Sequence, residues 1–276
     1  MRVLASLGVF ATDDNYTFGL TPIGASLQST GFGSMRSMVL TLGEEHYQAW
    51  GELLHSICSG EPAFDHVYGT DLFTYPGRNP RARMTFNDAM MDVTSLVSIA
   101  LLGSCDFSEF SKIVEVGGGY GSLIKAILMA NPTVCGVLFD APQIIESAGA
   151  YFSSPELNGR CQAIGGNVLD FVPDGGDAYI LKNVIHDWDD DHSLAILRNC
   201  RRAMVEKGKV LLVEMLMPLK GGAAFESLMD LNMLVISTGR ERSEPEYREL
   251  LDAAGLRITK IVPTLSPFGI IEAARS

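Results

Sequence analysis

The segment IVEVGGGYGSL, residues 113–123, joins an apolar, β-branched run to four glycines and then to a second apolar run. This order predicts a buried strand, a tight turn and the start of a helix. Glycine lets the backbone turn sharply and lets a ligand approach closely, and the free amides of a helix N-terminus point at that ligand. The segment therefore indicates an α/β fold that binds a nucleotide-like cofactor at the carboxyl end of a strand.

The spacing of the glycines argues against a nicotinamide dinucleotide. A dinucleotide-binding turn has the pattern G-x-G-x-x-G. Counted from Gly117 and Gly119, the third glycine of that pattern would fall on Ser122. A nicotinamide-dependent dehydrogenase is therefore the least favoured of the functions considered.

The sequence after this turn has the alternating strand and helix pattern of a doubly wound sheet. From Lys112 onward, short β-rich runs alternate with amphipathic runs, which predicts a mostly parallel sheet with helices on both faces. Ser243 and Glu246 have the spacing of a capping box, and Gly255 stands where the helix that they begin should end. The runs LRITKIV and GIIEAA then predict a closing pair of strands.

The N-terminal part of the chain has a different pattern. A short apolar helix precedes GVFATDDNYTFGLTP, residues 8–22, in which two strand-like runs flank a turn. We therefore expect a helix and a β-wing. Residues 35–102 have mostly helical periodicity, and TYPGRNPRAR, residues 74–83, is expected to form a loop within it.

The composition favours a small-molecule partner. The 276 residues carry a formal net charge of −12, whereas nucleic acids and anionic membranes are bound by clustered Lys and Arg. No apolar run approaches the length of a membrane span. The five cysteines are scattered and never have CxxC spacing, which argues against a disulfide framework and a zinc site. We therefore expect a reduced, cytoplasmic protein with no metal and no nucleic-acid or membrane partner.

Asp140 ends the strand expected after the glycine turn. A carboxylate roughly 20 residues beyond such a turn can accept hydrogen bonds from both hydroxyls of a ribose. The alternative is that Asp140 caps the helix that begins near Gln143. The combination of the glycine turn and this acid favours the cofactor interpretation.

The segment LKNVIHDWDDDHS, residues 181–193, places a histidine just beyond the end of another expected strand. Side chains at the carboxyl end of a strand in a doubly wound sheet face the ligand crevice, so His186 and Asp187 are candidates for chemistry. A lone histidine is more often structural. The acids at 189–191 are most simply the first turn of the next helix, and Trp188 is most simply a packing residue.

Two glutamates can reach the same crevice. Glu214 ends the strand LLVEM, and Glu241 lies in the loop GRERSE. A carboxylate on one imidazole nitrogen orients the ring and stabilises its charged form, which lets the other nitrogen take a proton from a hydroxyl. The alternative for Glu241 is an ion pair with Arg240 or Arg242.

With these motifs in order, the chain resembles the S-adenosylmethionine-dependent O-methyltransferases, a family that includes plant caffeate and flavonoid, animal hydroxyindole and bacterial polyketide-tailoring enzymes. The resemblance covers essentially the whole chain. It rests on GVFATDDNYTFGLTPIGASL, TFNDAM, EVGGGYG, FDAP, GGNVLDFVPDGGDAYILKNVIHDWDDDH, LLVEMLMP and GRERSEPEYRELLDAAG.

The resemblance implies a seven-stranded, Rossmann-like catalytic domain at residues 96–276. It also implies a partial winged-helix and helical region for dimerisation and for covering the substrate at residues 1–95, shorter than the usual family version. The expected product is a methylated hydroxyl on a small, aromatic or polyketide-like molecule. The expected assembly is a homodimer, and S-adenosyl-L-homocysteine is the expected by-product.

The resemblance also assigns residues to roles. The cofactor set is Glu115, Gly117, Gly119, Asp140, Asn167, Val168 and Lys182, with S-adenosylmethionine as the cofactor. The catalytic set is His186 as general base with Glu214 and Glu241 beside it. The substrate set is Asp187, Phe86, Asn87, Met90, Asn232 and Met233. Many family members have Asp where this chain has Asn167, so a neutral amide is expected to face the adenine.

Two further functions compete with O-methyl transfer. One is a relative that binds the same cofactor but performs decarboxylation or hydroxylation. The other is a ligand sensor whose wing reads DNA, but only one basic residue, Arg2, lies in the first 30 residues. The complete His-Glu-Glu set favours O-methyl transfer over the first, and the scarcity of basic residues argues against the second.

Overall fold

The computed structural model describes residues 1–15, 17–29, 31, 33–152, 157, 159–220 and 224–276. Its centre is a twisted sheet with the strand order β5-β4-β3-β6-β7-β10-β9. The first five of these strands run parallel, and β10 is antiparallel to both β7 and β9. The strands are β3 (Lys112–Val116), β4 (Cys135–Asp140), β5 (Cys161–Gly165), β6 (Ala178–Lys182), β7 (Lys209–Met217), β9 (Leu256–Pro263) and β10 (Phe268–Arg275). The predicted seven-stranded, mostly parallel sheet is confirmed, and a short eighth strand, β8 (Arg242–Ser243), pairs with β7.

Both faces of the sheet are covered, because successive side chains of its central strands are apolar. In β3, Ile113 packs on one face, whereas Val114 and Val116 pack on the other. The first face is covered by α8 (Pro80–Leu102), α9 (Ser122–Ala130) and α10 (Pro142–Phe152). The second is covered by α11 (Asp190–Ala203) and α13 (Glu244–Ala253). Helix α13 begins with the predicted capping box of Ser243 and Glu246.

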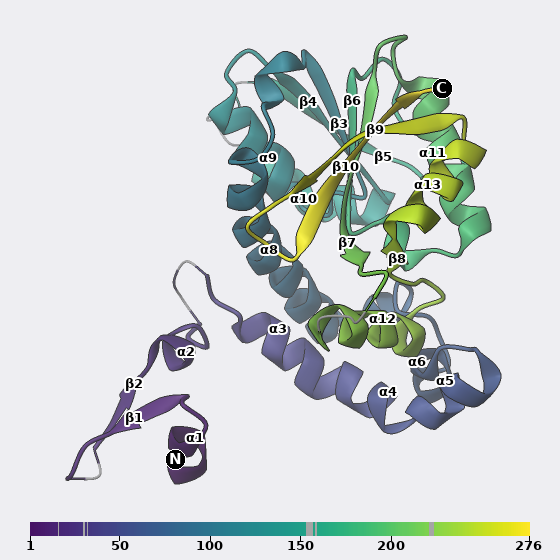
Figure 1. Cartoon of the computed structure of the whole chain (residues 1–276). Helices are drawn as coiled ribbons and strands as arrows, with labels where there is room; N and C mark the ends of the chain where they lie inside the picture. The colour runs from purple at the N-terminus through teal and green to yellow at the C-terminus, as the bar shows by residue number, and fades with distance from the viewer. Residues whose placement is uncertain (16, 30, 32, 153–156, 158, 221–223) are drawn as a thin grey trace.

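A layer of helices lies below the carboxyl ends of the parallel strands (Figure 1). It contains α3 (Arg36–Thr41), a π-helical turn η1 (Leu42–His46), α4 (Tyr47–Gly51), α5 (Leu53–Ser59), α6 (Ala63–Tyr68) and α12 (Ala224–Ile236). Its core consists of Ala49, Ala63, Phe64, Leu72, Val235 and Ile236. Because α12 comes from the second half of the chain, this layer joins the two halves.

Helix α8 connects the helical layer to the sheet. It packs against α3 near its beginning, while Val97 and Leu101 near its end enter the core under the sheet. The helix is therefore continuous across residues 95 and 96, where the two expected units meet. The division into two functional units stays a prediction.

The first residues form the expected helix and wing. They consist of α1 (Arg2–Ser6), the antiparallel pair β1 (Phe10–Thr12) and β2 (Phe18–Leu20), and α2 (Pro22–Ala25). Figure 1 shows this group apart from the sheet. Tyr16 of the expected wing lies outside the described residues.

The loop predicted at residues 74–83 was wrong. These residues form α7 (Tyr75–Arg78) and the first turn of α8, separated by Asn79. The side chain of Asn79 accepts a hydrogen bond from the Ala82 amide and caps α8. Proline is tolerated in the first turn of a helix, where its missing N–H has no intrahelical partner, so Pro76 and Pro80 begin helices instead of breaking them.

No helix in the described part of the chain has the length and apolar character needed to cross a membrane.

Candidate active site

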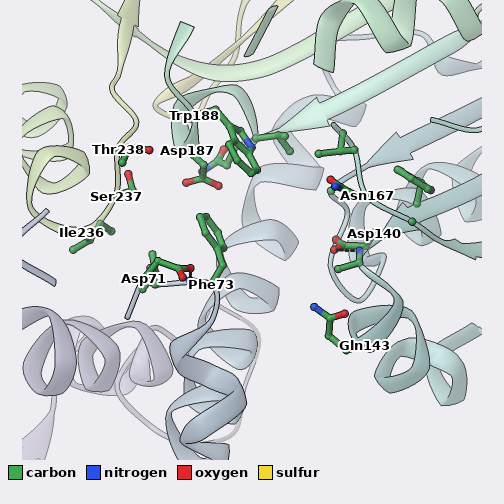
Figure 2. Close-up of a pocket in the computed structure, with 18 of the residues that line it drawn as sticks. Asp71, Phe73, Asp140, Gln143, Asn167, Asp187, Trp188, Ile236, Ser237 and Thr238 are labelled. Atoms are coloured by element: carbon green, nitrogen blue, oxygen red, sulfur yellow. Dashed lines mark hydrogen bonds between the residues drawn. The ribbon is translucent and has the colours of Figure 1, made fainter. Parts of the chain in front are cut away.

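A cavity of about 650 Å³ lies where the carboxyl ends of β3, β4 and β6 meet the helical layer (Figure 2). One half of its wall comes from the strand ends and the loops that follow them. The other half comes from α6, the loop after it, and the end of α12. The lining residues are Pro62, Asp65, Asp71, Leu72, Phe73, Gly117, Phe139, Asp140, Ala141, Pro142, Gln143, Gly166, Asn167, Val168, Asn183, Val184, Asp187, Trp188, Ile236, Ser237 and Thr238.

The glycine turn forms the floor of the first half. Gly117 has φ +68°, which favours glycine, and a Cβ there would lie 2.7 Å from Cγ2 of Val184. Gly119 has φ +59°, and its amide donates a hydrogen bond of 2.7 Å to Oδ2 of Asp140. Gly117 therefore lines the cavity with backbone alone, at a position where a side chain would clash with Val184.

Asp140 lines the cavity at the end of β4. Its Oδ1 accepts a hydrogen bond of 2.7 Å from the Ala141 amide, and burial raises the pKa of its carboxyl group. The carboxylate accepts from the amides of Gly119 and Ala141, which precede α10. The side chain therefore ties the strand end to the glycine turn instead of capping the helix. Asn167 and Val168 line the same half of the cavity, and Oδ1 of Asn167 accepts from the Leu169 amide at 3.0 Å.

Glu115 and Lys182 are two ionisable residues behind the turn. Oε2 of Glu115 accepts a hydrogen bond of 3.1 Å from the Ile124 amide in the first turn of α9. Burial raises the pKa of Glu115 to about 8. Burial also lowers the pKa of Lys182, although the carboxylates of Glu115, Glu214 and Asp187 oppose that shift. Neither residue lines the cavity, so both act on it through the turn and through charge.

His186 lies in a short 3₁₀ turn, η4 (Ile185–Asp187), next to the cavity. Its Nδ1 is 2.9 Å from Oε1 of Glu241 and 3.9 Å from Oε2 of Glu214. Its Nε2 is 3.4 Å from Oδ1 of Asp187. The structure therefore brings together the three residues predicted as the catalytic set.

The three carboxylates control the protonation of this histidine. Burial lowers the pKa of His186, but the charges of Asp187, Glu214 and Glu241 outweigh it and raise the pKa to about 10. Burial raises the pKa of Glu214 to about 7 and that of Asp187 to about 6. The cluster therefore favours the charged form of the imidazole in the protein without cofactor or acceptor.

His186 lies one step behind the cavity wall. The side chain is only 9% exposed, and Asp187 is the member of the cluster that lines the cavity. Figure 2 shows the Asp187 carboxylate on the cavity side, beside Trp188 and across from Phe73. If Nε2 of His186 accepts a proton from a molecule in the cavity, that proton must pass beside the Asp187 side chain.

Backbone contacts fix the position of the η4 turn. Oε1 of Glu214 accepts from the amides of Val184 at 3.1 Å and Ile185 at 2.9 Å. The fully buried Arg242 donates to the Ile185 and Trp188 carbonyls at 3.0 and 2.9 Å.

The loop that carries Glu241 packs directly on the same turn. Gly239 contacts the backbone of Asp187 so closely that a Cβ would lie 2.8 Å from its Cα. Arg240 and Arg242 both pair with Asp190 at 2.8 Å, which leaves Glu241 to His186. The alternative ion pair between Glu241 and either arginine is therefore not formed.

Of the six residues predicted to bind substrate, one lines the large cavity, one lines a smaller cavity, and four line neither. Asp187 lines the large cavity, whereas Phe86 lines a smaller one of about 20 Å³. Asn87 donates a hydrogen bond of 2.7 Å to the Tyr120 hydroxyl, and Asn232 accepts one of 3.0 Å from Nε1 of Trp50. Met90 and Met233 are half-buried and buried, respectively, and neither borders the large cavity.

Several lining residues had no signal in the sequence. The rings of Phe73 and Trp188 stack with centroids 6.2 Å apart and planes 8° apart, so Trp188 also faces the cavity. Asn183 is the non-glycine residue with positive φ, +53°, among those described. Such a backbone often marks a functional loop, but a sequence shows it only when glycine occupies the position.

The same cluster has the residue types of a metal site. Ligand atoms of His186, Glu214 and Glu241 all lie within 4.8 Å of one another. Two backbone amides already occupy Oε1 of Glu214, however, and Glu241 occupies Nδ1 of His186. The hydrogen bonds therefore fit an imidazole held in place by carboxylates better than a metal ligand. Its second ring nitrogen, Nε2, faces Asp187.

Comparison with known proteins agrees with this geometry. Residues 50–257 match the model of the O-methyltransferase domain family. The chain belongs to this O-methyltransferase family. It is 40% identical over 273 residues to the phenazine O-methyltransferase PhzM of Lysobacter antibioticus, a match that covers 99% of this chain and 80% of that protein.

Solved structures of the family confirm the fold and the cofactor. The crystal structure of LaPhzM has a TM-score of 0.93 at 40% identity and covers 100% of this chain and 83% of that one. NcsB1 from neocarzinostatin biosynthesis was solved with S-adenosylmethionine and 2-hydroxy-5-methyl naphthoic acid. It has a TM-score of 0.85 at 32% identity, and the match covers 100% of this chain and 83% of that one. The protein is thus an S-adenosylmethionine-dependent O-methyltransferase, and family membership excludes the nicotinamide dehydrogenase interpretation.

The described residues fit this cofactor. Gly117 lines the cavity without a side chain, and Asp140 presents a half-buried carboxylate between the glycine turn and the cavity. A nucleoside with two ribose hydroxyls and an extended amino-acid arm requires a site with those two features.

Proposed function

We propose that the protein methylates a hydroxyl of a small aromatic or polyketide-like molecule, with His186 as the general base. The observation that carries this proposal is the buried contact between Nδ1 of His186 and Oε1 of Glu241, directly behind the cavity wall. A carboxylate there fixes the tautomer and aims Nε2 outward.

Each residue of the cluster has a defined task in this proposal. When bound, the cofactor supplies an electrophilic methyl group carried on a sulfonium. Nε2 of His186 takes the hydroxyl proton while the oxygen bonds to the methyl carbon and the carbon–sulfur bond breaks. Glu241 and Glu214 stabilise the imidazolium, and the two amides on Glu214 hold it in place. Asp187, at the cavity surface, positions the acceptor hydroxyl.

The base must be neutral before it can act. The carboxylates raise the pKa of His186 to about 10, so the free protein holds the imidazolium near neutral pH. A positive charge brought into the cavity lowers the pKa of a neighbouring imidazolium. We therefore infer that the histidine becomes a competent base only in the loaded site.

Each residue of the cofactor set is proposed to contact or support one part of S-adenosylmethionine. Gly117 and Gly119 lie against the amino-acid arm, Asp140 binds the ribose, and Asn167 and Val168 flank the adenine. Lys182 and Glu115 support the site electrostatically from behind. Asn87 reaches the cofactor turn through the Tyr120 hydroxyl. Phe86, Met90, Asn232 and Met233 lie outside the lining of the large cavity and would support its helical wall from behind.

We further propose a cytoplasmic homodimer. All five cysteines are free thiols, as expected in a reducing compartment. The N-terminal elements expose apolar side chains, among them Leu4, Leu7, Ile23 and Val39, which a partner subunit would cover.

A labelling experiment tests the reaction type. The protein is incubated with methyl-deuterated S-adenosylmethionine and a panel of hydroxylated naphthalenes and phenazines, and the products are analysed by mass spectrometry and NMR. The proposal expects a deuterated methyl on oxygen. Transfer to nitrogen or carbon alone, or loss of a carboxyl group without methyl transfer, would refute it.

A further inference from the structure

A second, smaller cavity lies in the helical layer beside the large one. It has a volume of about 20 Å³ and is lined by Thr41, Glu45, His46, Phe64, Leu72, Tyr75, Ala82 and Phe86. Leu72 also lines the large cavity, so the two spaces share this residue in their walls. The small cavity therefore extends the acceptor half of the active site away from the sheet.

The small cavity contains polar groups that lack partners. His46 is 5% exposed, and neither of its ring nitrogens has a hydrogen bond of good geometry among the described residues; the nearby Asn232 side chain, a weaker partner that raises the pKa of His46 slightly, already accepts from Trp50. Thr41 is 4% exposed, and its hydroxyl is likewise unpartnered in the described structure. Buried polar atoms are nearly always paired, because an unmade hydrogen bond costs about 1–3 kcal/mol. Two such side chains on one cavity point to a polar group that binds between them.

The backbone is irregular where these residues lie. Thr41 ends α3, and His46 ends the π-helical turn η1 that follows it. A π-helical turn inserts an extra residue into a helix and is frequent at functional sites. It breaks the α-helical spacing between Thr41 and His46, and both side chains border the same cavity.

The size and charge of the cavity limit what can bind. A volume of about 20 Å³ accepts one oxygen-sized group and no ring. Burial lowers the pKa of His46 to about 4, against a smaller opposing effect of Asn232, so the imidazole is neutral. Glu45 borders the same space. A carboxylate would find no cation there and would face an acid.

We propose that the small cavity is the distal subsite of the acceptor site, in which His46 and Thr41 bind an uncharged hydroxyl or carbonyl oxygen of the acceptor. The inference rests on the proposed function, because it assumes that the acceptor occupies the large cavity beside Asp187. Displacement of the Leu72 side chain joins the two spaces. The acceptor class is thus an aromatic molecule with a second, neutral oxygen at the end remote from the methylated hydroxyl.

Binding of matched probes tests this subsite. Dissociation constants of 2-naphthol, 2,6-dihydroxynaphthalene and 6-hydroxy-2-naphthoate are measured by calorimetry with saturating S-adenosylhomocysteine. The wild type is expected to bind the diol about 5-fold more tightly than either other probe, the value of roughly one buried hydrogen bond. His46→Phe should reduce that preference to about one, and Thr41→Val should reduce it in part.

His66→Phe is the matched control, because His66 is an exposed histidine of α6 that stacks on His55. It should retain the preference. If His46→Phe does not fold, His46→Leu and Thr41→Val carry the same comparison. Equal affinities in the wild type, no binding of any probe, or an unchanged preference in the variants would each overturn the proposal and indicate that the cavity holds only water. The titrations measure binding without turnover. A failure of this subsite proposal can therefore be distinguished from a failure of the proposed methyl transfer to oxygen.

Discussion

Nδ1 of His186 lies 2.9 Å from Oε1 of Glu241, and both residues are buried directly behind the wall of the active-site cavity. One nitrogen of the ring is thereby committed to a carboxylate, which leaves Nε2 for proton transfer. The contact spans 55 positions of the chain and depends on the loop that follows α12. It ties protonation of the histidine to the placement of that loop.

Replacing this carboxylate should shift the pH dependence of the reaction. The carboxylates raise the pKa of His186, and the base acts only when neutral, so kcat/KM should rise with pH through that pKa. Glu241→Gln removes one negative charge, lowers the pKa of His186, and should move the rising limb to lower pH by about 1 unit. The plateau should fall about 10-fold because the ring is held less firmly. An unshifted limb would contradict the role of Glu241, and Glu244→Gln on the exposed pair with Arg248 is the control.

Asp140 should govern cofactor affinity without setting the rate of the chemical step. Asp140→Asn keeps the shape of the side chain but loses the charge that accepts ribose hydroxyls. Hydrogen bonds to charged groups contribute about 1.5–3 kcal/mol, so the dissociation constant of S-adenosylhomocysteine should rise about 10- to 100-fold. Calorimetry checks this against Asp170→Asn, an exposed residue outside the cavity lining. Equal affinities in the two variants would remove Asp140 from the cofactor site.

Much of the sheet and of the catalytic cluster could be predicted because local patterns determined them. The glycine turn, Asp140, His186 and Glu214 each follow or end a strand whose apolar run is evident in the sequence, whereas Glu241 lies in the loop before the capped helix. Parallel strands gather their carboxyl ends at one edge, so residues distant in the chain were expected together.

The acceptor half of the site could not be predicted in the same way. Asp71 and Phe73 reach the cavity from a loop of the helical layer, and helix packing has no short sequence pattern that sets which loop faces the sheet. The π-helical turn before His46 is invisible in the residues that form it. Pro76 and Pro80 indicated a loop, because a proline that breaks a helix and one that begins it look alike in a sequence.

Gly239 should be intolerant of any side chain. A Cβ at this position would lie 2.8 Å from Cα of Asp187 and would push the catalytic turn away from its loop. Gly239→Ala should lower the free energy of unfolding by about 1–3 kcal/mol and reduce kcat by at least 10-fold. Urea denaturation and steady-state kinetics measure both effects. Gly149→Ala, where a Cβ meets no atom within 4 Å, should leave both quantities near wild-type values, and similar losses in the two variants would contradict this account.

Glu115 should make the stability of the protein depend on pH. Burial raises the pKa of Glu115 from 4.5 to about 8, so the folded protein keeps the proton while the unfolded chain releases it near pH 4.5. The free energy of unfolding should therefore fall as the pH rises from about 4.5 to about 8. Glu115→Gln does not titrate and should flatten that dependence, with a gain of a few kcal/mol, on the order of 2–4, at pH 8. Urea denaturation from pH 5 to 8 tests this, with the exposed Glu206→Gln as control. Parallel curves for the wild type and Glu115→Gln would show that Glu115 is ionised in the folded state.

The most direct test of the catalytic assignment is single-turnover methyl transfer by His186→Asn, measured together with the affinity for S-adenosylhomocysteine. General base catalysis contributes about 10²- to 10⁴-fold, so the rate of transfer should fall by that factor while the dissociation constant stays within about 3-fold of the wild type. A rate close to the wild-type value in a variant that still binds the cofactor would contradict the assignment of His186 as the base.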